Sequence, residues 1–362
     1  MKILYVSKLE GHQWQGPTHS VPMQIKFQSE IDEVLWVNLC KTINEEWKEL
    51  PYYYEAKNEL KVSLDELPKN FRKPDIVVFE GVYEYPFAKI VYEIWKRNIP
   101  YVLVPRSALT NDAQKKRHLK KIIGNVVFFN RFIYKSSSIQ YLTDSEQKDS
   151  QKWNTQYFVI PNGILAKTAK KEYAILKEKL RFTYIGRIEQ YQKGLDLLIE
   201  ACSKISTDIR SAASIHIYGP DREDSFKLLD EEIKKNNISD IIYIHESVFG
   251  EKKENVLLNS DAFIMTSRFE GLPMGLIEAL AYGLPVLITQ GTNLASEVSD
   301  ANAGWTTENT VEGISRMIKT AISERDKYSE KSNNAYNLSK NYDWRRISEK
   351  THLEYKKIVD NN

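Results

Sequence analysis

Residues 266–285 read TSRFEGLPMGLIEALAYGLP and carry the strongest structural signal in the chain. An apolar run, Ala262-Phe263-Ile264-Met265, comes just before this stretch and has the composition of a buried strand. The tight turn Gly271-Leu272-Pro273-Met274-Gly275 comes next, and an amphipathic helical pattern follows it. A strand, a glycine turn and a helix start direct backbone N–H groups and the positive end of the helix dipole into one crevice. The stretch therefore predicts a site for an anion.

Two carboxylates flank the turn. Glu270 and Glu278 are eight positions apart, one on the turn and the other inside the predicted helix, just over two helical turns later. We expect the two side chains to occupy different depths of the same cleft. This arrangement suits a ligand that carries both phosphates and several hydroxyls.

Short apolar runs alternate with helical patterns along the whole chain, which predicts an α/β protein with parallel sheets. Strands are expected at 2–6, 33–37, 76–79, 101–104, 139–142, 157–160, 182–185, 214–218, 241–245, 262–265 and 285–288. Helices are expected at 20–30, 86–97, 113–134, 194–205, 225–236, 275–282, 311–322 and 324–338. The turn Pro161-Asn162-Gly163 precedes a Lys-rich segment and predicts a domain boundary, although a surface loop within one domain has the same composition.

The composition is that of an ordinary globular protein. A chain of 362 residues is long enough for about two domains. Its net charge of +2 gives no argument for nucleic-acid binding, and no apolar run is long enough for a membrane span. The start lacks a signal-peptide pattern, so we expect a cytoplasmic protein in which Cys40 and Cys202 are reduced.

Two cations form the next candidate group. Arg187 and Lys193 follow the predicted strand at 182–185 and stand beside Gly186 and Gly194. A guanidinium binds phosphate oxygens in pairs, and a lysine supplies a compact point charge. Together with a helix start, the two cations would neutralise a diphosphate. Two solvated surface cations are the alternative interpretation.

With these segments the chain resembles the group 1 family of retaining glycosyltransferases, whose E-x7-E motif is matched by Glu270 and Glu278. The resemblance implies the GT-B fold: two Rossmann-like domains that face each other across a cleft. Residues 1–163 would bind the acceptor and residues 164–340 the nucleotide sugar. A helix at 341–362 would pack back on the first domain, although its periodicity alone equally allows it to cap the second.

The same resemblance implies an activity. The enzyme would move a sugar from a nucleotide diphosphate, most often a UDP-sugar in this family, to a hydroxyl of a saccharide or lipid-linked saccharide. The anomeric configuration would be retained. Bacterial surface-polysaccharide assembly is the setting that analogy suggests.

Roles follow for individual residues. By resemblance Arg187 and Lys193 would hold the pyrophosphate, Glu278 the ribose, and Glu270 the sugar or the charge developing at its anomeric carbon. Glu270, Arg187 and Lys193 are the expected catalytic residues. The expected donor-binding set is Arg187, Lys193, Gly219, Gly271, Leu272, Met274, Gly275, Leu276, Glu278 and Gly16. Gly219 has an ordinary turn as its alternative. Residues from His245 onward would border the base, with His245 itself a packing residue.

The first domain offers fewer signals. Gly16 lies in a predicted loop, GHQWQGPTHS at 11–20, with a helix starting near Val21; relatives often have paired glycines where this chain has Gly16-Pro17. His19 is either a helix cap or an acceptor contact. Arg106 would contact a phosphate or the acceptor, with a structural salt bridge as the alternative.

Two further expectations concern partners. There is no Asp-x-Asp and no His, Asp or Glu cluster with metal-ligand spacing, so we expect no cofactor and no metal, with Arg187 and Lys193 in place of a divalent ion. The basic run KKRHLKK at 115–121 adjoins apolar residues. It is either a membrane-surface contact or the solvated face of a core helix.

Three other functions compete. A nucleotide-sugar epimerase or hydrolase would share the fold but need no sugar acceptor. A non-catalytic nucleotide-sugar-binding partner would retain the charged residues. A dinucleotide oxidoreductase is disfavoured, because no G-x-G-x-x-G follows the first predicted strand.

Overall fold

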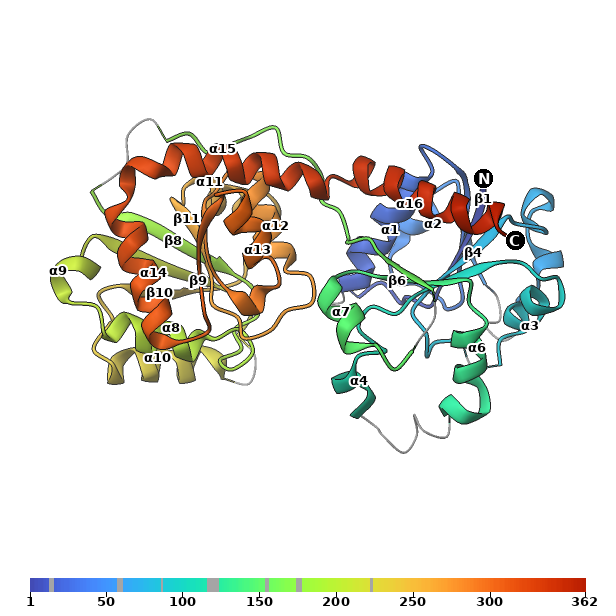
Figure 1. The fold of residues 1–362 in the computed structure, drawn as a ribbon, viewed down its shortest axis with the longest axis horizontal. Coiled ribbons are helices and arrows are strands. Elements are labelled where there is room, and N and C mark those ends of the chain that lie inside the picture. Colours follow the sequence, from blue (N-terminus) through green and yellow to red (C-terminus); the bar gives the residue numbers. More distant parts are fainter. Residues whose placement is uncertain are drawn as a thin grey trace. The chain divides into compact units, whose positions relative to one another are not determined.

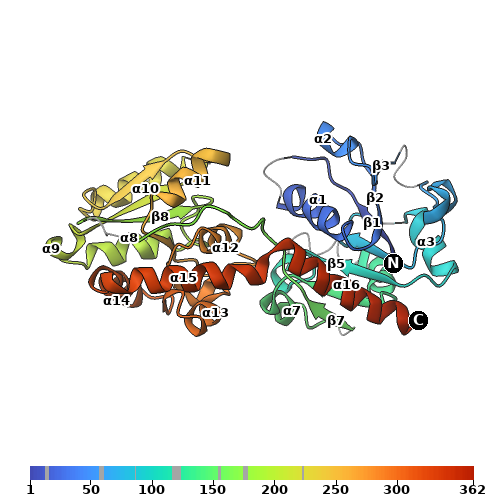
Figure 2. The same ribbon diagram turned by 90° about the horizontal axis from the view of Figure 1, so that it is seen from above.

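The computed structural model describes residues 1–12, 16–56, 61–85, 87–115, 124–153, 156–173, 178–221 and 224–362. The chain divides into two compact units (Figures 1 and 2). Unit 1 consists of Met1–Gly163 and Trp344–Asn362, and unit 2 of Ile164–Asp343. Each unit is built around one parallel sheet, so the predicted α/β class is confirmed.

The sheet of unit 1 has seven strands in the order β3-β2-β1-β4-β5-β6-β7, and every pairing is parallel. The strands are β1 (Lys2–Ser7), β2 (Glu33–Asn38), β3 (Tyr53–Glu55), β4 (Ile76–Glu80), β5 (Tyr101–Val104), β6 (Ser138–Tyr141) and β7 (Tyr157–Val159). The central strands are buried along almost their whole length, because helices cover both faces of a parallel sheet.

Helices lie on both faces of this sheet, with α1 and α16 above it and α4 and α6 below it in the view of Figure 1. The helices are α1 (Gly16–Gln28), α2 (Glu45–Lys48), α3 (Lys89–Lys96), α4 (Asn111–Lys115), α6 (Asn130–Tyr134), α7 (Asp144–Asp149) and α16 (Trp344–Asp360). Alternate strand residues supply the two cores. Ile3 and Tyr5 belong to the cluster that includes Tyr355 of α16, and Leu4 and Val6 to the opposite one.

Specific contacts fix α16 within unit 1. Trp344 stacks on Phe27 of α1, with ring centroids 6.5 Å apart and an interplanar angle of 10°. The hydroxyl of the fully buried Tyr355 donates to Gln140 Oε1 over 2.9 Å. These contacts occur at both ends of the helix, so the return of the chain to unit 1 is a packed feature of the fold.

The sheet of unit 2 has six parallel strands in the order β10-β9-β8-β11-β12-β13. They are β8 (Leu180–Ile185), β9 (Ala213–Tyr218), β10 (Ile242–His245), β11 (Ala262–Met265), β12 (Val286–Thr289) and β13 (Gly304–Thr307). The helices are α8 (Leu195–Ser203), α9 (Thr207–Arg210), α10 (Ser225–Lys235), α11 (Gly250–Leu258), α12 (Met274–Ala281), α13 (Ala295–Asp300), α14 (Val311–Ser323) and α15 (Tyr328–Ser339). In Figure 1, α11, α12 and α15 lie above the sheet, and α8 and α10 below it.

The strand order of unit 2 reverses at its centre. The chain passes from β8 to β9 on one side, and after β10 it returns to place β11 on the other side of β8. The helices that follow β8 and β11, α8 and α12, lie on opposite faces of the sheet, and open α/β sheets bind ligands beyond the carboxyl ends of the strands at such a reversal.

Several predicted elements need correction. The helix expected near Val21 begins at Gly16, because Pro17 in the first turn has the backbone angle that a helix start requires. The strands β3 and β13 were not predicted; both are short and are defined by pairing with a neighbouring strand. The long helix expected at 113–134 is in part outside the described residues. Its described end contains a π-helical turn, Asn125–Phe129, before α6.

One glycine tests the packing of α16. A Cβ on Gly163 would lie 2.6 Å from the indole of Trp344, a distance that requires the ring to move. We predict that Gly163→Ala destabilises unit 1 by about 1–3 kcal/mol, the usual cost of overpacking. Urea denaturation followed by tryptophan fluorescence measures the effect. Gly16→Ala is the control, since its Cβ meets open space. Equal stability of the two variants would contradict the packing of Trp344 against this turn.

Candidate functional site

The loops that follow β8 and β11, the two central strands of unit 2, meet through an ion pair. Lys193 Nζ lies 2.7 Å and 2.8 Å from the two carboxylate oxygens of Glu270. Ser267 Oγ donates to the same carboxylate over 2.5 Å. Only 10% of the Lys193 side chain and 8% of the Glu270 side chain are exposed. Two of the residues predicted to be catalytic are therefore in direct contact.

A second ion pair joins the loop after β11 to the first turn of α8. Arg268 donates from Nη1 and Nη2 to the two oxygens of Asp196, at 2.7 Å and 2.8 Å. Its guanidinium also lies over the ring of Tyr191, 4.5 Å from the centroid, and donates to the Tyr191 carbonyl over 2.7 Å. The backbone N–H of Arg268 donates to the Gln192 carbonyl over 2.9 Å. These bonds, which we call the loop clasp, hold the backbone of both loops in register.

Gly194 allows the two loops to approach this closely. It has φ of 61°, in the left-handed region, immediately before α8. A Cβ at this position would collide with the carbonyl oxygen of Thr266, whose hydroxyl donates to the Gly194 carbonyl over 2.9 Å. The glycine predicted at a phosphate-binding turn is thus required by contacts within the protein as well.

Arg187 differs from Lys193 in its exposure. The side chain of Arg187 is 55% exposed. Its Nη1 lies 3.5 Å from Glu189 Oε2, and its Nη2 donates to Gln192 Oε1 over 3.3 Å. These exposed contacts contribute little to stability. The guanidinium is therefore available to an anion at the end of β8.

Glu278 has a partner that the sequence did not reveal. Its Oε2 accepts a hydrogen bond from the Nζ of Lys253, which projects from α11 onto α12. The sequence had predicted a carboxylate whose partners are ribose hydroxyls; the structure gives it a lysine. Both acidic residues of the E-x7-E pattern are therefore ion-paired with a lysine.

The other predicted donor-binding residues have varied environments. Leu276 is fully buried in the core of unit 2, so a ligand could meet only its backbone. Leu272 and Met274 are partly buried and pack against the same core, and Gly271 is exposed. Gly275 lies in α12 against the carboxyl end of β8: a Cβ on this glycine would be 3.1 Å from the Ile185 carbonyl oxygen.

Gly219 borders a pocket at the ends of β9 and β10. A Cβ there would collide with the carbonyl oxygen of Gly186, so the glycine serves the packing of neighbouring strand ends. The pocket has a volume of about 420 Å³ and is lined by Gly219, Pro220, Asp221, Phe226, Glu246 and Ser247. Its lining includes the segment that was expected to border the base.

Four aromatic rings stack next to this pocket. The ring of His245 lies 4.4 Å from that of Tyr218 and 5.2 Å from that of His216, which in turn lies 5.0 Å from Tyr243. Nδ1 of His216 and Nε2 of His245 are 2.9 Å apart. Burial, with the charge of Arg181, lowers the pKa of His216 to about 4 and lowers that of His245. His245 thus packs in the stack, as its place at a strand end predicted.

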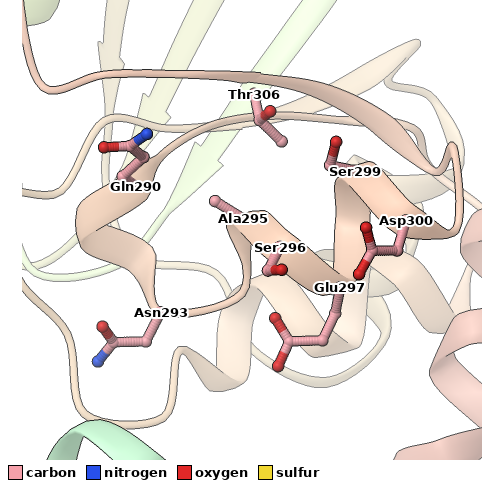
Figure 3. Close-up of a pocket in the computed structure, with 8 residues that line it drawn as sticks. All are labelled: Gln290, Asn293, Ala295, Ser296, Glu297, Ser299, Asp300 and Thr306. Atoms are coloured by element: carbon pink, nitrogen blue, oxygen red, sulfur yellow. The ribbon is translucent and has the colours of Figure 1, made fainter.

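A second pocket lies beside β12 and α13. Its volume is about 470 Å³, and Figure 3 shows amides from Gln290 and Asn293 on one side and the carboxylates of Glu297 and Asp300 on the other. Asn293 also donates to the Glu270 carbonyl, which links this pocket to the ion-paired loop. No cation is among its lining residues, so its charge opposes a phosphate and favours neutral hydroxyl groups.

In unit 1, Arg106 is part of a buried network. It bonds to Glu80 Oε2 from Nε at 2.9 Å and from Nη2 at 2.8 Å, and it donates to Ser20 Oγ over 3.0 Å. The salt bridge considered from the sequence is therefore present. Gly16 and His19 are exposed in the first turn of α1, not in a loop as predicted, and most of the basic run 115–121 lies outside the described residues.

Sequence reasoning missed the residues that position the charged ones. Asp196 and Arg268 are 72 positions apart in the sequence, so their pairing depends on how distant segments come together in the fold. Lys253 carried no pattern of its own. Arg268 lies inside the quoted stretch, and its position two residues before Glu270 is the one signal that was available.

The described residues contain neither a group of metal ligands nor a helix that could span a membrane. Within these ranges no three His, Cys, Asp or Glu side chains are grouped so as to hold a metal ion. No helix in the described part of the chain has both the length and the apolar composition to cross a membrane.

Residues 166–338 match the sequence model described as glycosyl transferases group 1. This segment belongs to that glycosyltransferase family. The match includes Arg187, Lys193, Glu270 and Glu278 and covers nearly all of unit 2. The glycosyltransferase family predicted from the E-x7-E pattern is therefore confirmed.

Curated relatives are similar over part of their length. The chain is 24% identical to the lipopolysaccharide glucosyltransferase WaaG of Escherichia coli over 185 residues, which are 47% of this chain and 48% of that protein. It is 33% identical to a glycogen synthase of Geotalea uraniireducens over 118 residues, 33% of this chain and 23% of that one. The chain spans less than half of the length of the curated relatives it matches.

Solved structures extend the likeness to the whole fold. Anabaena HepE in complex with UDP gives a TM-score of 0.74 at 14% identity, covering 99% of this chain and 100% of that one. Sucrose-phosphate synthase from Thermosynechococcus elongatus gives 0.70 at 13% identity, covering all of both chains. These relatives have the GT-B fold, so the predicted fold class is confirmed.

The loop clasp has a measurable energy. We predict that Asp196→Asn and Arg268→Gln each destabilise unit 2 by about 1–3 kcal/mol and that the double variant costs far less than the sum, because the two side chains act as a pair. Chemical denaturation measures the coupling. Additive losses would show that the two side chains stabilise the loops independently. The exposed pair Lys234 and Asp230 on α10 is the control, for which a coupling below about 0.5 kcal/mol is expected.

The histidine stack predicts a pH dependence. The unfolded chain protonates its histidines near pH 6.5, whereas folded His216 remains neutral down to a pKa of about 4. The unfolded state therefore binds more protons in this window, and the stability of unit 2 should fall as the pH is lowered from about 6.5 to 4. Denaturation at pH 7 and pH 5 should show a smaller loss for His216→Gln than for the wild type. Equal losses in the variant and the wild type would refute the prediction.

Proposed function

We propose that this protein transfers a sugar, with retention of configuration, from a nucleotide diphosphate donor to a hydroxyl of a saccharide or lipid-linked saccharide. The membership of residues 166–338 in a glycosyltransferase family supports the reaction class. A UDP-sugar is the proposed donor, since HepE, which shares the fold, is known in complexes with UDP and with UDP-glucose. Surface-polysaccharide assembly is the proposed setting, because one relative is a lipopolysaccharide glucosyltransferase.

The contact between Lys193 and Glu270 carries the proposal. Both groups are largely buried beyond the carboxyl ends of β8 and β11, and each neutralises the other. A buried charge that loses its partner costs several kcal/mol, so an arriving diphosphate must share Lys193 with Glu270. Lys193 then holds the Glu270 carboxylate near the diphosphate but out of contact with it. From this position the carboxylate can contact the sugar and stabilise positive charge at the anomeric carbon.

The remaining groups are assigned along the donor. Arg187, exposed at the end of β8, binds the outer phosphate oxygens. Glu278, held by Lys253, accepts hydrogen bonds from the ribose hydroxyls. The pocket of about 420 Å³ beside Gly219 receives the base, with backbone groups of Glu246 and Ser247 at its rim. The backbone of residues 271–276 approaches the phosphates through the amino end of α12.

We further propose that transfer needs no metal ion. Departure of the nucleotide leaves negative charge on the β-phosphate, and Lys193, Arg187 and the dipole of α12 are arranged to stabilise it. Gly16 is assigned to the donor, and His19 and Arg106 are assigned to the acceptor side. Of these, Arg106 would act through its network with Glu80 and Ser20.

The test separates binding from chemistry. Glu270→Gln should lower sugar transfer by about 100-fold or more, because it removes charge stabilisation at the reacting carbon. The same variant should keep or increase the thermal shift produced by UDP, because Lys193 loses its competing partner. Lys193→Met should lose that shift. The measurements are thermal shift with UDP-, GDP- and ADP-sugars, and product formation with EDTA present.

Three results would contradict parts of the proposal. Full activity of Glu270→Gln would contradict a catalytic role for that carboxylate. Loss of all turnover in EDTA would show that transfer requires a metal ion. Rapid conversion of the donor without acceptor would indicate an epimerase or hydrolase. Glu231→Gln, an exposed change on α10, controls for general effects of losing a carboxylate.

A further inference from the structure

The loop that carries Glu270 is held by side chains from two other segments. We call residues 266–273, between β11 and α12, the Glu270 loop. The Ser267 carbonyl in this loop accepts hydrogen bonds from Asn309 Nδ2 over 2.7 Å and from Thr289 Oγ1 over 2.8 Å. Thr289 ends β12, and Asn309 lies between β13 and α14. The backbone of the loop is therefore fixed by side chains that come from outside it.

Asn309 uses both ends of its carboxamide. While Nδ2 donates to the Ser267 carbonyl, Oδ1 accepts from the Gly291 N–H over 2.9 Å. A carboxamide is both a donor and an acceptor, so it can bridge a carbonyl and an N–H. A carboxylate of the same shape would still accept from Gly291, but it would place a second oxygen against the Ser267 carbonyl. The bridge between the two segments therefore depends on asparagine at this position.

The segment after β12 lies against the backbone of the Glu270 loop. A Cβ on Gly291 would be 2.2 Å from the Arg268 carbonyl oxygen and 2.3 Å from that of Ser267, so a larger residue requires the loop to move. Asn293 follows, with φ of 61° in the left-handed region that asparagine tolerates. Its Nδ2 donates to the Glu270 carbonyl. Two carboxamides thus hold the loop, one at Ser267 and the other at Glu270.

Ser267 transmits this constraint to the carboxylate of Glu270. Ser267 is fully buried, and its Oγ donates to Glu270 Oε1 over 2.5 Å. Lys193 contacts both carboxylate oxygens with one ammonium group, a point charge that by itself fixes the carboxylate plane only loosely. The contact with Ser267 selects one orientation. Because a displacement of about 1 Å can cost about 100-fold in rate, such an anchor matters for the chemistry.

We propose that Asn309 and Asn293 are positioning residues for Glu270. Asn309 acts through Ser267, and Asn293 acts through the Glu270 backbone. The inference rests on the proposed function in one respect, which is the role of the Glu270 carboxylate at the sugar. Both carboxamides act through contacts within the protein, so their loss should slow transfer without weakening the binding of the diphosphate.

Exchange of one carboxamide nitrogen for oxygen tests the proposal. Asn309→Asp removes the donor to Ser267 and keeps the acceptor for Gly291. It should lower kcat by about 10- to 100-fold, while the KM for the donor changes by less than about twofold and the thermal shift produced by UDP stays that of the wild type. Asn293→Asp should change the same quantities in the same direction.

Asn236→Asp is the matched control. Asn236, at the carboxyl end of α10, also donates from Nδ2 to a backbone carbonyl, that of Glu232, over 2.9 Å. Asn309→Asp and Asn236→Asp each remove one such bond, so both should lower the melting temperature, but only Asn309→Asp should lower kcat. Equal kcat in the two variants, or a KM that rises as much as kcat falls, overturns the proposal.

A double variant shows whether Asn309 acts through Glu270. In the Glu270→Gln background, Asn309→Asp should change transfer by less than about threefold, because the carboxylate that it positions is gone. An undiminished loss means that Asn309 acts by another route and overturns the proposal. Full activity of Glu270→Gln alone contradicts the proposed function. An impaired Glu270→Gln together with a normal Asn309→Asp contradicts only the positioning role.

A readout without turnover tests the same contacts independently of the reaction. Amide hydrogen exchange across residues 266–273, followed by mass spectrometry, should be about tenfold faster in Asn309→Asp than in the wild type, because the loop loses an anchor and opens more often. Asn236→Asp should exchange at the wild-type rate over these residues. Equal exchange in all three proteins overturns the proposal even where no donor is transferred.

Discussion

The ion pair between Lys193 and Glu270 is the interaction on which the candidate site depends. It joins the loops after β8 and β11, which leave the sheet at the point where its strand order reverses. A buried pair of this kind gives little net stability, because the loss of hydration offsets much of its attraction. Its significance is geometric: it places one positive and one negative group in a fixed relation at the point where the strand order reverses.

The surrounding contacts explain why that relation is well defined. The loop clasp, which includes Asp196, Arg268 and Tyr191, holds the two loops together. The close approach of Gly194 to Thr266 is a further contact between them. Hydrogen bonds to charged groups are stronger than neutral ones, and a bidentate pair also fixes orientation. A site that is organised before the ligand arrives loses less entropy on binding.

Much of the fold could be predicted from periodicity. β1, β5 and β11 were predicted at or within one residue of their observed ends, because central strands of a parallel sheet form continuous apolar runs between turns. β3 and β13 were missed, because each is a short edge strand whose conformation is defined by its neighbour. The start of α1 was misplaced by several residues, since Pro17 was interpreted as part of a loop although it suits a first helical turn.

The sequence by itself determined the alternation of strands and helices and the family of residues 166–338, and it singled out four charged residues as candidates, because each depends on local spacing along the chain. Only the tertiary structure decided how those charges are paired. Glu270 meets Lys193, Glu278 meets Lys253 and Arg268 meets Asp196, and each pair joins loops or helices that are separate in sequence. Periodicity reports which side of an element is buried, but it contains no information on which side chains of two distant elements come within hydrogen-bond distance. That depends on the register in which the sheet and its loops pack.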